Sequence, residues 1–460
     1  MKKLPHHSTP TGLLWLAVAL LAKYIALNYL GPLIFAVPGA LVRGLLEWRG
    51  RGRILAAIIW GFLFTLLFHS WALNYGLLAW LGLMLARGLP WALLCFPPLL
   101  LKKWILKEQA AWGELLALSL GYALVCLTLL LGVTGNDWES PAAAMAYQSW
   151  FLATLPWLGL TLSSLMIGLI SIFTFCGKTR ARISSLALLA CWVVLGSMLG
   201  RSSAGTPKRL EKRVALVQTG WSQEQKWDDK ERQKGIQRLI SLTTAGAEKG
   251  ADLVIWPETA WPYRGMRRRF SDTRKVGRLA RSLKVQLLAS SVEETEDGYW
   301  HNSVSRITSS GRFSHEYRKI RLAPFAEYIP LPAAMEETLR KTPPFGYISR
   351  YLPGDDETIL ELENLHYSVL ICFESQVPWM VAERQDSVDF FVVVTNDAPL
   401  IDNAPKEYHF RSAILRAAQF RRPFVQASNN GVTGVIDAHG RVLKRTPPGF
   451  DGPDVLVVDI

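Results

Sequence analysis

The sequence has little that would support a disulfide framework, a metal centre or a nucleotide-binding site. Its five cysteines are scattered, and no two of them have the Cys-x-x-Cys spacing of zinc or redox motifs. No internal repeat, Walker phosphate loop or Gly-x-Gly-x-x-Gly fingerprint occurs along the chain. We therefore expect neither a metal nor an organic cofactor.

Charge is also scarce. Only 19% of the 460 residues are charged, whereas 50% are hydrophobic, 18 are Trp, and the mean hydropathy is +0.16. This balance indicates a membrane part joined to a soluble part. The formal net charge of +13 would suit a nucleic-acid binder. However, many basic residues form short clusters between apolar segments, which is typical of membrane loops, and no nucleic-acid partner is expected.

Seven apolar stretches predict a polytopic membrane domain over residues 1–200. They lie at 12–30, 31–47, 54–73, 75–100, 112–133, 151–176 and 184–200. Most reach the roughly 20 residues that a membrane-spanning helix needs. The second is shorter and contains Pro38 and Arg43. No small-residue cleavage site follows the first stretch, so it is expected to be a membrane helix and not a signal peptide.

The loop charges predict the orientation of this domain. Basic clusters occur near residues 2–3, 49–53, 102–107 and 178–182, whereas the intervening loops are nearly uncharged or acidic. With basic loops in the cytoplasm, seven spans place residue 201 onward outside it. We expect a multi-pass protein of the bacterial inner membrane with its second half on the periplasmic side.

The second half has the pattern of an α/β domain. After a linker at 201–212, short β-branched runs alternate with longer polar helical stretches over 213–460. Three reactive side chains lie at or near the ends of such runs or in a basic segment: Glu258, Lys319 and Cys372. A carboxylate, an ammonium and a thiol suffice for acyl transfer through a thioester.

Each of these residues has an ordinary structural interpretation when taken alone. A Cys at the end of a strand is more often a small buried side chain than a nucleophile. Glu258 follows Trp256-Pro257 and could cap a helix or occupy a solvated turn, and Lys319 belongs to a basic run that could be a solvated face.

The order and spacing of several short strings resemble the nitrilase, or carbon–nitrogen hydrolase, superfamily. With a multispan domain attached, the chain is most similar to its apolipoprotein N-acyltransferase branch. The strings that carry the resemblance are Trp256-Pro257-Glu258, Tyr317-Arg318-Lys319, Cys372-Phe373-Glu374, Thr395-Asn396-Asp397, Lys226-Trp227-Asp228 and His301-Asn302-Ser303.

The resemblance implies a fold and a set of roles. The fold is a multi-span α-helical membrane domain followed by a nitrilase-like αββα sandwich. Cys372 would be the nucleophile, Glu258 the general base and Lys319 the oxyanion stabiliser, with Glu327 and Glu374 in supporting positions. Four aromatic residues would bind substrate: Trp227, Phe325, Tyr328 and Phe373.

The implied reaction moves a fatty acyl chain from a phospholipid to Cys372 and then to the N-terminal amine of a diacylglyceryl-cysteine lipoprotein. The expected partners are the phospholipid donor, the diacylated lipoprotein and the lipid bilayer, with the protein acting as a monomer. The alternative is a membrane-tethered amidase, or an amide-forming enzyme, that acts on a small substrate. Two departures favour it: Ala398-Pro399-Leu400 replaces a usual aromatic pair, and no apolar span follows the domain where the family normally has one. A catalytically inactive scaffold is disfavoured because all three reactive residue types are present.

Overall fold

The protein was analysed as a computed structural model that describes residues 10–101, 111–131, 135–202, 210–266, 269–341, 350–356, 358–400, 402–447 and 449–460. The chain divides into two compact units, Met1–Ser203 and Ala204–Ile460. Each unit has its own buried apolar residues.

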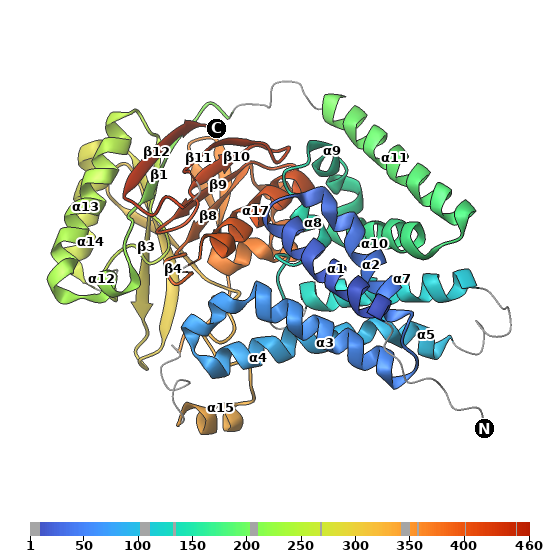
Figure 1. Ribbon diagram of the computed structural model, residues 1–460. Helices are drawn as coiled ribbons and strands as arrows, with labels where there is room; N and C mark the ends of the chain where they lie inside the picture. The colour runs from blue at the N-terminus through green and yellow to red at the C-terminus, as the bar shows by residue number, and fades with distance from the viewer. Residues whose placement is uncertain are drawn as a thin grey trace. The chain divides into compact units, whose positions relative to one another are not determined.

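The first unit is entirely helical where it is described (Figure 1). Its elements are α1 (Pro10–Asn28), the 3-10 helix η1 (Gly31–Ala36), α2 (Val37–Leu45), α3 (Arg51–Phe68), η2 (Ser70–Tyr75), α4 (Leu77–Gly88), η3 (Leu89–Cys95), α5 (Phe96–Leu100), α7 (Ala111–Leu131), α8 (Pro141–Ala144), α9 (Ser149–Leu152), α10 (Leu155–Cys176) and α11 (Thr179–Ser202).

Six helical stretches among the described residues are long and apolar enough to cross a membrane. They are Pro10–Asn28, Arg51–Phe68, Trp80–Leu100, Trp112–Leu131, Leu155–Cys176 and Thr179–Ser202. The predicted stretch 31–47 forms a shorter apolar helical segment, Gly31–Leu45. Its Pro38 lies in the first turn of α2, where a missing N–H is tolerated. These helices identify a membrane protein, and the count of seven spans stays a prediction.

A group of charged side chains is buried inside this helical unit. Arg87 of α4 donates from Nε to Glu139 Oε1 at 2.8 Å, and Nε2 of His69 lies 3.2 Å from the same oxygen. The ammonium of Lys23 lies 3.7 Å from the ring centroid of Phe64. Charges in such an environment are stable only when paired or placed against aromatic faces.

The second unit contains two six-stranded mixed sheets. The first has the order β12-β1-β2-β3-β4-β5 and the second the order β11-β10-β9-β8-β7-β6. The strands are β1 (Arg213–Gln218), β2 (Leu253–Ile255), β3 (Gln286–Glu294), β4 (Trp300–Ile307), β5 (Phe313–Arg318), β6 (Ile359–Leu362), β7 (Leu365–Ile371), β8 (Phe390–Thr395), β9 (Phe424–Ser428), β10 (Gly434–Ile436), β11 (Val442–Arg445) and β12 (Asp454–Asp459).

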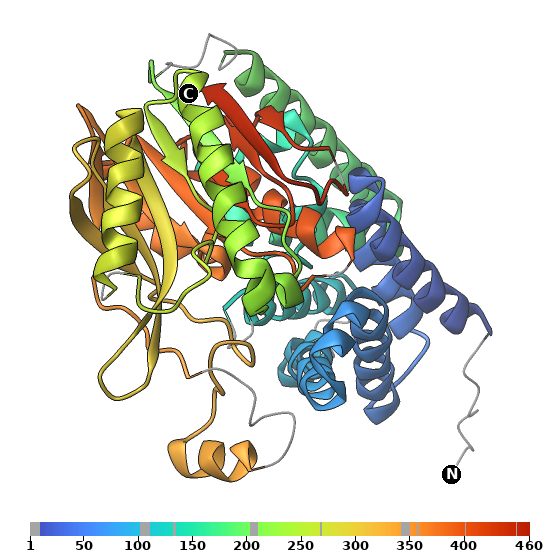
Figure 2. The ribbon, with the colours of Figure 1, turned by 90° about the vertical axis from the view of Figure 1, so that its left-hand side faces the viewer.

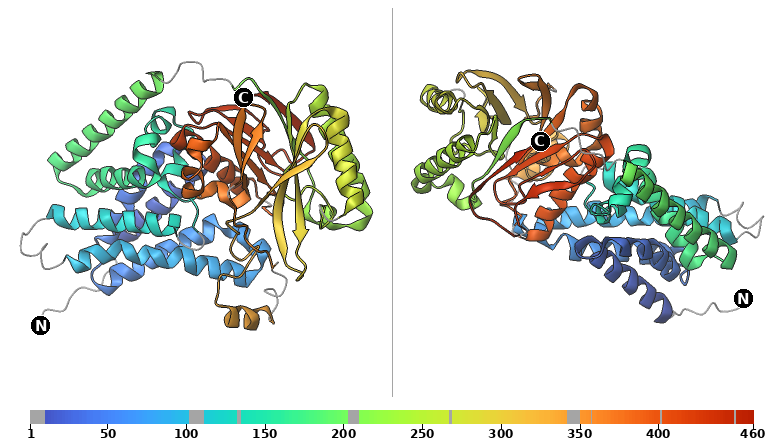
Figure 3. Two further views of the ribbon diagram at one scale, coloured as in Figure 1. Left: turned by 180° about the vertical axis from the view of Figure 1, so that it is seen from behind. Right: turned by 90° about the horizontal axis from the view of Figure 1, so that it is seen from above.

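The sheets pack face to face and helices cover their outer faces. One apolar core lies between the sheets and includes Val214 and Leu216 of β1 with Val369 and Ile371 of β7. A second core lies between the first sheet and the helices α13 (Asp229–Glu248) and α14 (Phe270–Leu283), which are seen on its outer side in Figures 2 and 3. The second sheet is covered by α16 (Pro378–Ala382) and α17 (Asn403–Phe420).

The remaining elements of this unit are short. They are α12 (Gln223–Trp227), α15 (Ala333–Arg340), η5 (Cys372–Gln376) and η6 (Gln385–Ser387). The largely apolar, buried runs of β1 and β7 explain the layering, because each strand buries one face against the facing sheet and the other against a helix. The predicted αββα sandwich is confirmed.

Candidate active site

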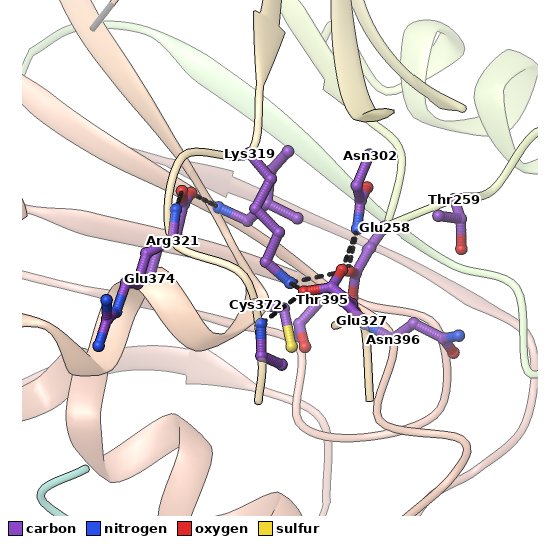
Figure 4. Close-up of polar contacts among 12 residues, drawn as sticks. Glu258, Thr259, Asn302, Lys319, Arg321, Glu327, Cys372, Glu374, Thr395 and Asn396 are labelled. Carbon is purple, nitrogen blue, oxygen red and sulfur yellow. Dashed lines mark hydrogen bonds and ion pairs between the residues drawn. The ribbon is translucent and has the colours of Figure 1, made fainter. Parts of the chain in front are cut away.

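The three predicted reactive residues come from three different strand ends and meet in one place (Figure 4). Glu258 lies three residues beyond β2, Lys319 follows β5 directly, and Cys372 follows β7 directly. The first two belong to one sheet and the third to the facing sheet. The face-to-face packing of the sheets therefore assembles the site.

Glu258 is held by donors on both oxygens of its carboxylate. Oε1 accepts a hydrogen bond from Asn302 Nδ2 at 2.6 Å, and Oε2 accepts one from the backbone N–H of Asn396 at 2.8 Å. The residue is only 6% exposed. These neutral donors fix the carboxylate while leaving it able to take a proton.

Lys319 is buried between two carboxylates. Its Nζ lies 2.8 Å from Glu327 Oε2 and 3.6 Å from Glu258 Oε1. Burial lowers the pKa of Lys319, but Glu327 and Glu258 together outweigh it and hold the pKa well above its ordinary value. The side chain is therefore a permanent cation. An ammonium has three donors, so it can serve the two carboxylates and a developing oxyanion.

Glu327 connects the other members of the set. Its Oε1 accepts from Asn302 Nδ2 at 3.1 Å, and Oε2 accepts from the backbone N–H of Ala323 at 2.7 Å as well as from Lys319. Asn302 thus bridges the carboxylates of Glu258 and Glu327. The predicted supporting position of Glu327 has a geometric basis in these contacts.

Cys372 adopts an unusual backbone conformation at the end of its strand. Its φ is +52°, in the left-handed region that non-glycine residues rarely occupy. Such backbone strain often occurs at functional sites, where it aims a side chain. Burial and the nearby carboxylate of Glu258 raise the pKa of the Cys372 thiol well above its ordinary value, although Lys319 lowers it. The resting thiol is therefore protonated, and attack requires a base that removes the proton.

Glu374 holds the two segments that carry Lys319 and Cys372. Its Oε1 accepts from the backbone N–H groups of Ile320 and Arg321, at 2.7 and 2.9 Å. Its Oε2 accepts from Ile371 N at 2.7 Å and from the Tyr317 hydroxyl at 2.8 Å. The carboxylate thereby ties the residues after β5 to the residues around Cys372.

A buried Asp–His pair contacts the backbone of Cys372. One ring nitrogen of His409 lies 2.9 Å from Asp397 Oδ1, and the other lies 3.1 Å from the carbonyl oxygen of Cys372. Burial lowers the pKa of His409, but Asp397 and the contact with the Cys372 carbonyl raise it overall. Sequence reasoning assigned no role to Asn302 and none to Asp397, because only nonlocal contacts reveal them.

The four aromatic residues predicted to bind substrate remain predictions. Trp227 ends α12, but its side chain lies outside the described part of the structure. Phe325 and Tyr328 are partly buried and joined by a backbone hydrogen bond of 2.8 Å, and Phe325 has a φ of +61°. Phe373 is 9% exposed beside Cys372. Within the described residues, no group of three or more His, Cys, Asp or Glu has the geometry to hold a metal ion.

An αββα sandwich with a Glu, a Lys and a Cys gathered at facing strand ends has the architecture of the nitrilase superfamily. Residues 213–460 match the family model described as carbon-nitrogen hydrolase, and the chain belongs to this family.

The regions matched by several named relatives include the helical unit as well as the second unit. The apolipoprotein N-acyltransferase of Brucella suis is 28% identical over 454 residues, which cover 94% of this chain and 81% of that protein. The protein of the same name from Pseudomonas paraeruginosa is 27% identical over 460 residues, covering 92% and 82%. That of Aquifex aeolicus is 29% identical over 302 residues, covering 63% of this chain and 64% of the relative's own length.

Solved structures match the second unit only distantly. The amidase from Nesterenkonia sp. AN1 in complex with butyramide has 17% sequence identity and a TM-score of 0.42, covering 56% of this chain and 94% of that one.

Proposed function

We propose that this protein is a membrane N-acyltransferase. It moves a fatty acyl chain from a phospholipid, through a thioester on Cys372, to the N-terminal amine of diacylglyceryl-cysteine lipoproteins. The observation that carries the proposal is the Glu258–Lys319–Cys372 set, with its two charged members buried, in a chain whose described residues include six long apolar helices. The names of relatives that match over most of the chain support the same reaction.

In the first half-reaction, Cys372 Sγ attacks the ester carbonyl carbon of the phospholipid. Glu258 takes the thiol proton, and the negative charge that develops on the carbonyl oxygen is stabilised by Lys319. The tetrahedral intermediate collapses with cleavage of the carbon–oxygen ester bond. Glu258 returns the proton to the leaving alkoxide, which departs as the hydroxyl of a lysophospholipid, and the acyl thioester remains.

In the second half-reaction, the lipoprotein amine attacks the thioester carbon. Glu258 accepts a proton from the amine, the carbon–sulfur bond breaks, and the Cys372 thiolate is reprotonated. The products are an amide and the free enzyme. We place this reaction on the periplasmic side of the bacterial inner membrane, with the bilayer supplying the donor.

A membrane-tethered amidase, or an amide-forming enzyme with a small acceptor, is the second candidate. The same three residues would serve it, with water or a small amine attacking the acyl-enzyme in place of a lipoprotein. The segment Ala398-Pro399-Leu400 favours this reading, because it offers no aromatic pair beside the site.

The proposal is tested in cells depleted of their own lipoprotein N-acyltransferase. Expression of this chain is expected to restore triacylated N-terminal peptides in mass spectra, and Cys372→Ala is expected to abolish them. Cys191→Ala is the matched control, because Cys191 is an exposed free cysteine of α11 outside the site. Well-expressed protein that leaves all lipoproteins diacylated would contradict the proposal.

The acyl group that Cys372 carries, and the donor that supplies it, distinguish the two candidate functions. A fatty-acyl group trapped on the Cys372 peptide after incubation with phospholipid vesicles supports the acyltransferase. Loading of Cys372 by a short-chain amide, with no transfer from phospholipid, supports the amidase.

A further inference from the structure

A lysine is buried beside the catalytic carboxylate and has no role in the reaction as described above. Lys226 of α12 is 1% exposed, and its Nζ donates to the backbone carbonyl oxygen of Glu258 at 3.3 Å. The same Nζ also contacts the hydroxyl of Thr259. Lys226 therefore contacts the main chain of Glu258 and the side chain of the residue that follows it.

The turn that Lys226 contacts is strained. Thr259, which follows Glu258 in Figure 4, has a φ of +48°. A β-branched residue rarely adopts this left-handed conformation, so surrounding contacts must hold it there. The ammonium supplies two such contacts, one to the carbonyl oxygen of the peptide group that joins Glu258 and Thr259 and one to the Thr259 side chain.

The short helix α12 also reaches the second support of the base. Asn396, whose backbone N–H donates to Glu258 Oε2, donates from its side chain to Gln223 Oε1 at 3.2 Å. The position of α12 is fixed by Ser222, which forms a reciprocal capping box with Gln225. The helix α12 thus contacts both the backbone of Glu258 and the residue that donates to its carboxylate.

Burial of the Lys226 ammonium lowers the stability of the folded protein. Burial lowers the pKa of Lys226 to about 7, and the carboxylate of Glu258 offsets only part of that effect. A neutral side chain at this position would avoid the loss of stability. A destabilising buried charge is therefore expected where the residue has a function.

We propose that Lys226 is a positioning residue for the general base: it clamps the strained Glu258–Thr259 turn and thereby fixes the Glu258 carboxylate against Cys372. This inference rests on the proposed function of Glu258. It does not require that the acyl donor be a phospholipid.

The test uses the full chain in detergent with phospholipid vesicles as donor, and it measures acylation of Cys372 by mass spectrometry. Lys226→Met is expected to slow acylation by about 10- to 100-fold, the loss typical of a misplaced catalytic group. The half-saturating phospholipid concentration is expected to stay unchanged, and the melting temperature is expected to be no lower than that of the parent. Lys234→Met is the matched control, because it removes an equal charge from the exposed face of α13.

A double-variant cycle decides whether Lys226 acts through Glu258. In a Glu258→Gln background, Lys226→Met is expected to cause no further loss, because the group that it positions is already disabled. Parent-like acylation by Lys226→Met, a full additional loss in that background, or a fall in melting temperature that parallels the fall in rate would each overturn the proposal.

A second readout separates failure of this inference from failure of the proposed function. Alkylation of the Cys372 thiol by iodoacetamide at pH 7 needs no acyl donor, yet it depends on a base that removes the thiol proton. If the parent takes no acyl group from phospholipid, the acyltransferase proposal fails, whereas slower alkylation of Cys372 in Lys226→Met still supports the clamp. Equal alkylation in the parent and in Lys226→Met contradicts the clamp whatever the donor.

Discussion

At the scale of single residues, the site combines a permanent cation with a thiol that stays protonated at rest. The Lys319 ammonium lies 3.6 Å from the carboxylate of Glu258, and its pKa is held well above its ordinary value. Lys319 favours a thiolate at Cys372, whereas burial and the carboxylates of Glu258, Asp397 and Glu327 oppose it. The thiol is therefore protonated at rest, and the proposed reaction requires Glu258 to accept its proton.

Loss of Lys319 is expected to affect both stability and catalysis. Lys319→Met leaves the carboxylates of Glu258 and Glu327 buried without their cation, which costs about 3–5 kcal/mol of unfolding free energy. The double variant Lys319→Met/Glu327→Gln is expected to recover much of this stability. Its acylation rate is still expected to be about 10²- to 10³-fold below the parent, because the oxyanion donor is missing.

Melting temperatures and single-turnover acylation of Cys372 check this prediction. Glu327→Gln alone is the control for the second substitution. Recovery of both stability and rate in the double variant would show that Lys319 is only structural.

Lys226 makes stability depend on pH in a defined direction. Its pKa is about 7 in the folded protein and 10.5 for the unperturbed side chain. Between these values the unfolded chain binds more protons than the folded one, so this group makes the unfolding free energy rise with pH. Below pH 7 the full penalty of a buried ammonium is present, and it disappears as the pH approaches 10.5.

Thermal unfolding of the parent and of Lys226→Met at pH values from 6 to about 9 checks this sign. The melting temperature of the parent, relative to that of the variant, is expected to rise as the pH increases through this range. Parallel curves would show that Lys226 is not the titrating group.

At the scale of secondary-structure elements, the central strands and the edge strands of the two sheets differ in composition. The central strands β2 and β8 are continuous apolar runs, and β9 is largely apolar. The strands β5, β6 and β11 lie at sheet edges. Edge strands bury less and carry more polar residues, so their apolar periodicity is weak.

The buried Arg87–Glu139 pair is expected to stabilise the helical unit only as a pair. Arg87→Leu leaves Glu139 without its main cationic partner and is expected to lower stability by about 3–5 kcal/mol. The double variant Arg87→Leu/Glu139→Leu removes both charges and is expected to recover most of that loss.

The stability of each variant is measured by thermal unfolding in detergent, monitored as the yield of monodisperse protein. Arg43→Leu is a control in which an arginine of α2 is replaced outside this charged group. A double variant that is no more stable than Arg87→Leu would show that the pair is not an isolated unit of stability.

At the scale of the whole molecule, the side of the membrane on which the second unit works depends on the number of crossings. The six long apolar helices among the described residues would return the chain to its starting side, whereas a further crossing by the shorter segment Gly31–Leu45 would make seven. The basic loops favour seven, with the second unit outside the cytoplasm. Pro38 and the nine-residue length of α2 make this segment the one to test.

A membrane-impermeant maleimide applied to intact spheroplasts decides the topology. Cysteine introduced by Lys230→Cys, at an exposed position of α13, is expected to be labelled without permeabilisation. Cysteine introduced by Arg180→Cys, at an exposed position in the basic first turn of α11, is expected to be labelled only after permeabilisation. Protection of both positions in intact cells would place the second unit in the cytoplasm and contradict the proposed reaction there.

The sequence by itself determined the class of molecule, and it predicts the chemistry of the site. Long apolar runs and clustered basic loops predict membrane helices because hydrocarbon thickness and loop charge act on local composition. The strings around Glu258, Lys319 and Cys372 point to thioester chemistry because the residue types themselves limit the reaction.

Tertiary structure alone decided how those residues are held. The bridge from Asn302 to two carboxylates, the backbone contact from Asn396 to Glu258, and the clamp by Lys226 join segments between 25 and 138 residues apart. No local pattern records such contacts. The contacts of Asn302 and Lys226 form between segments on the side of the first sheet, and the contact from Asn396 forms only because the two sheets pack face to face. Burial in that interface also sets the protonation states on which the proposed reaction depends.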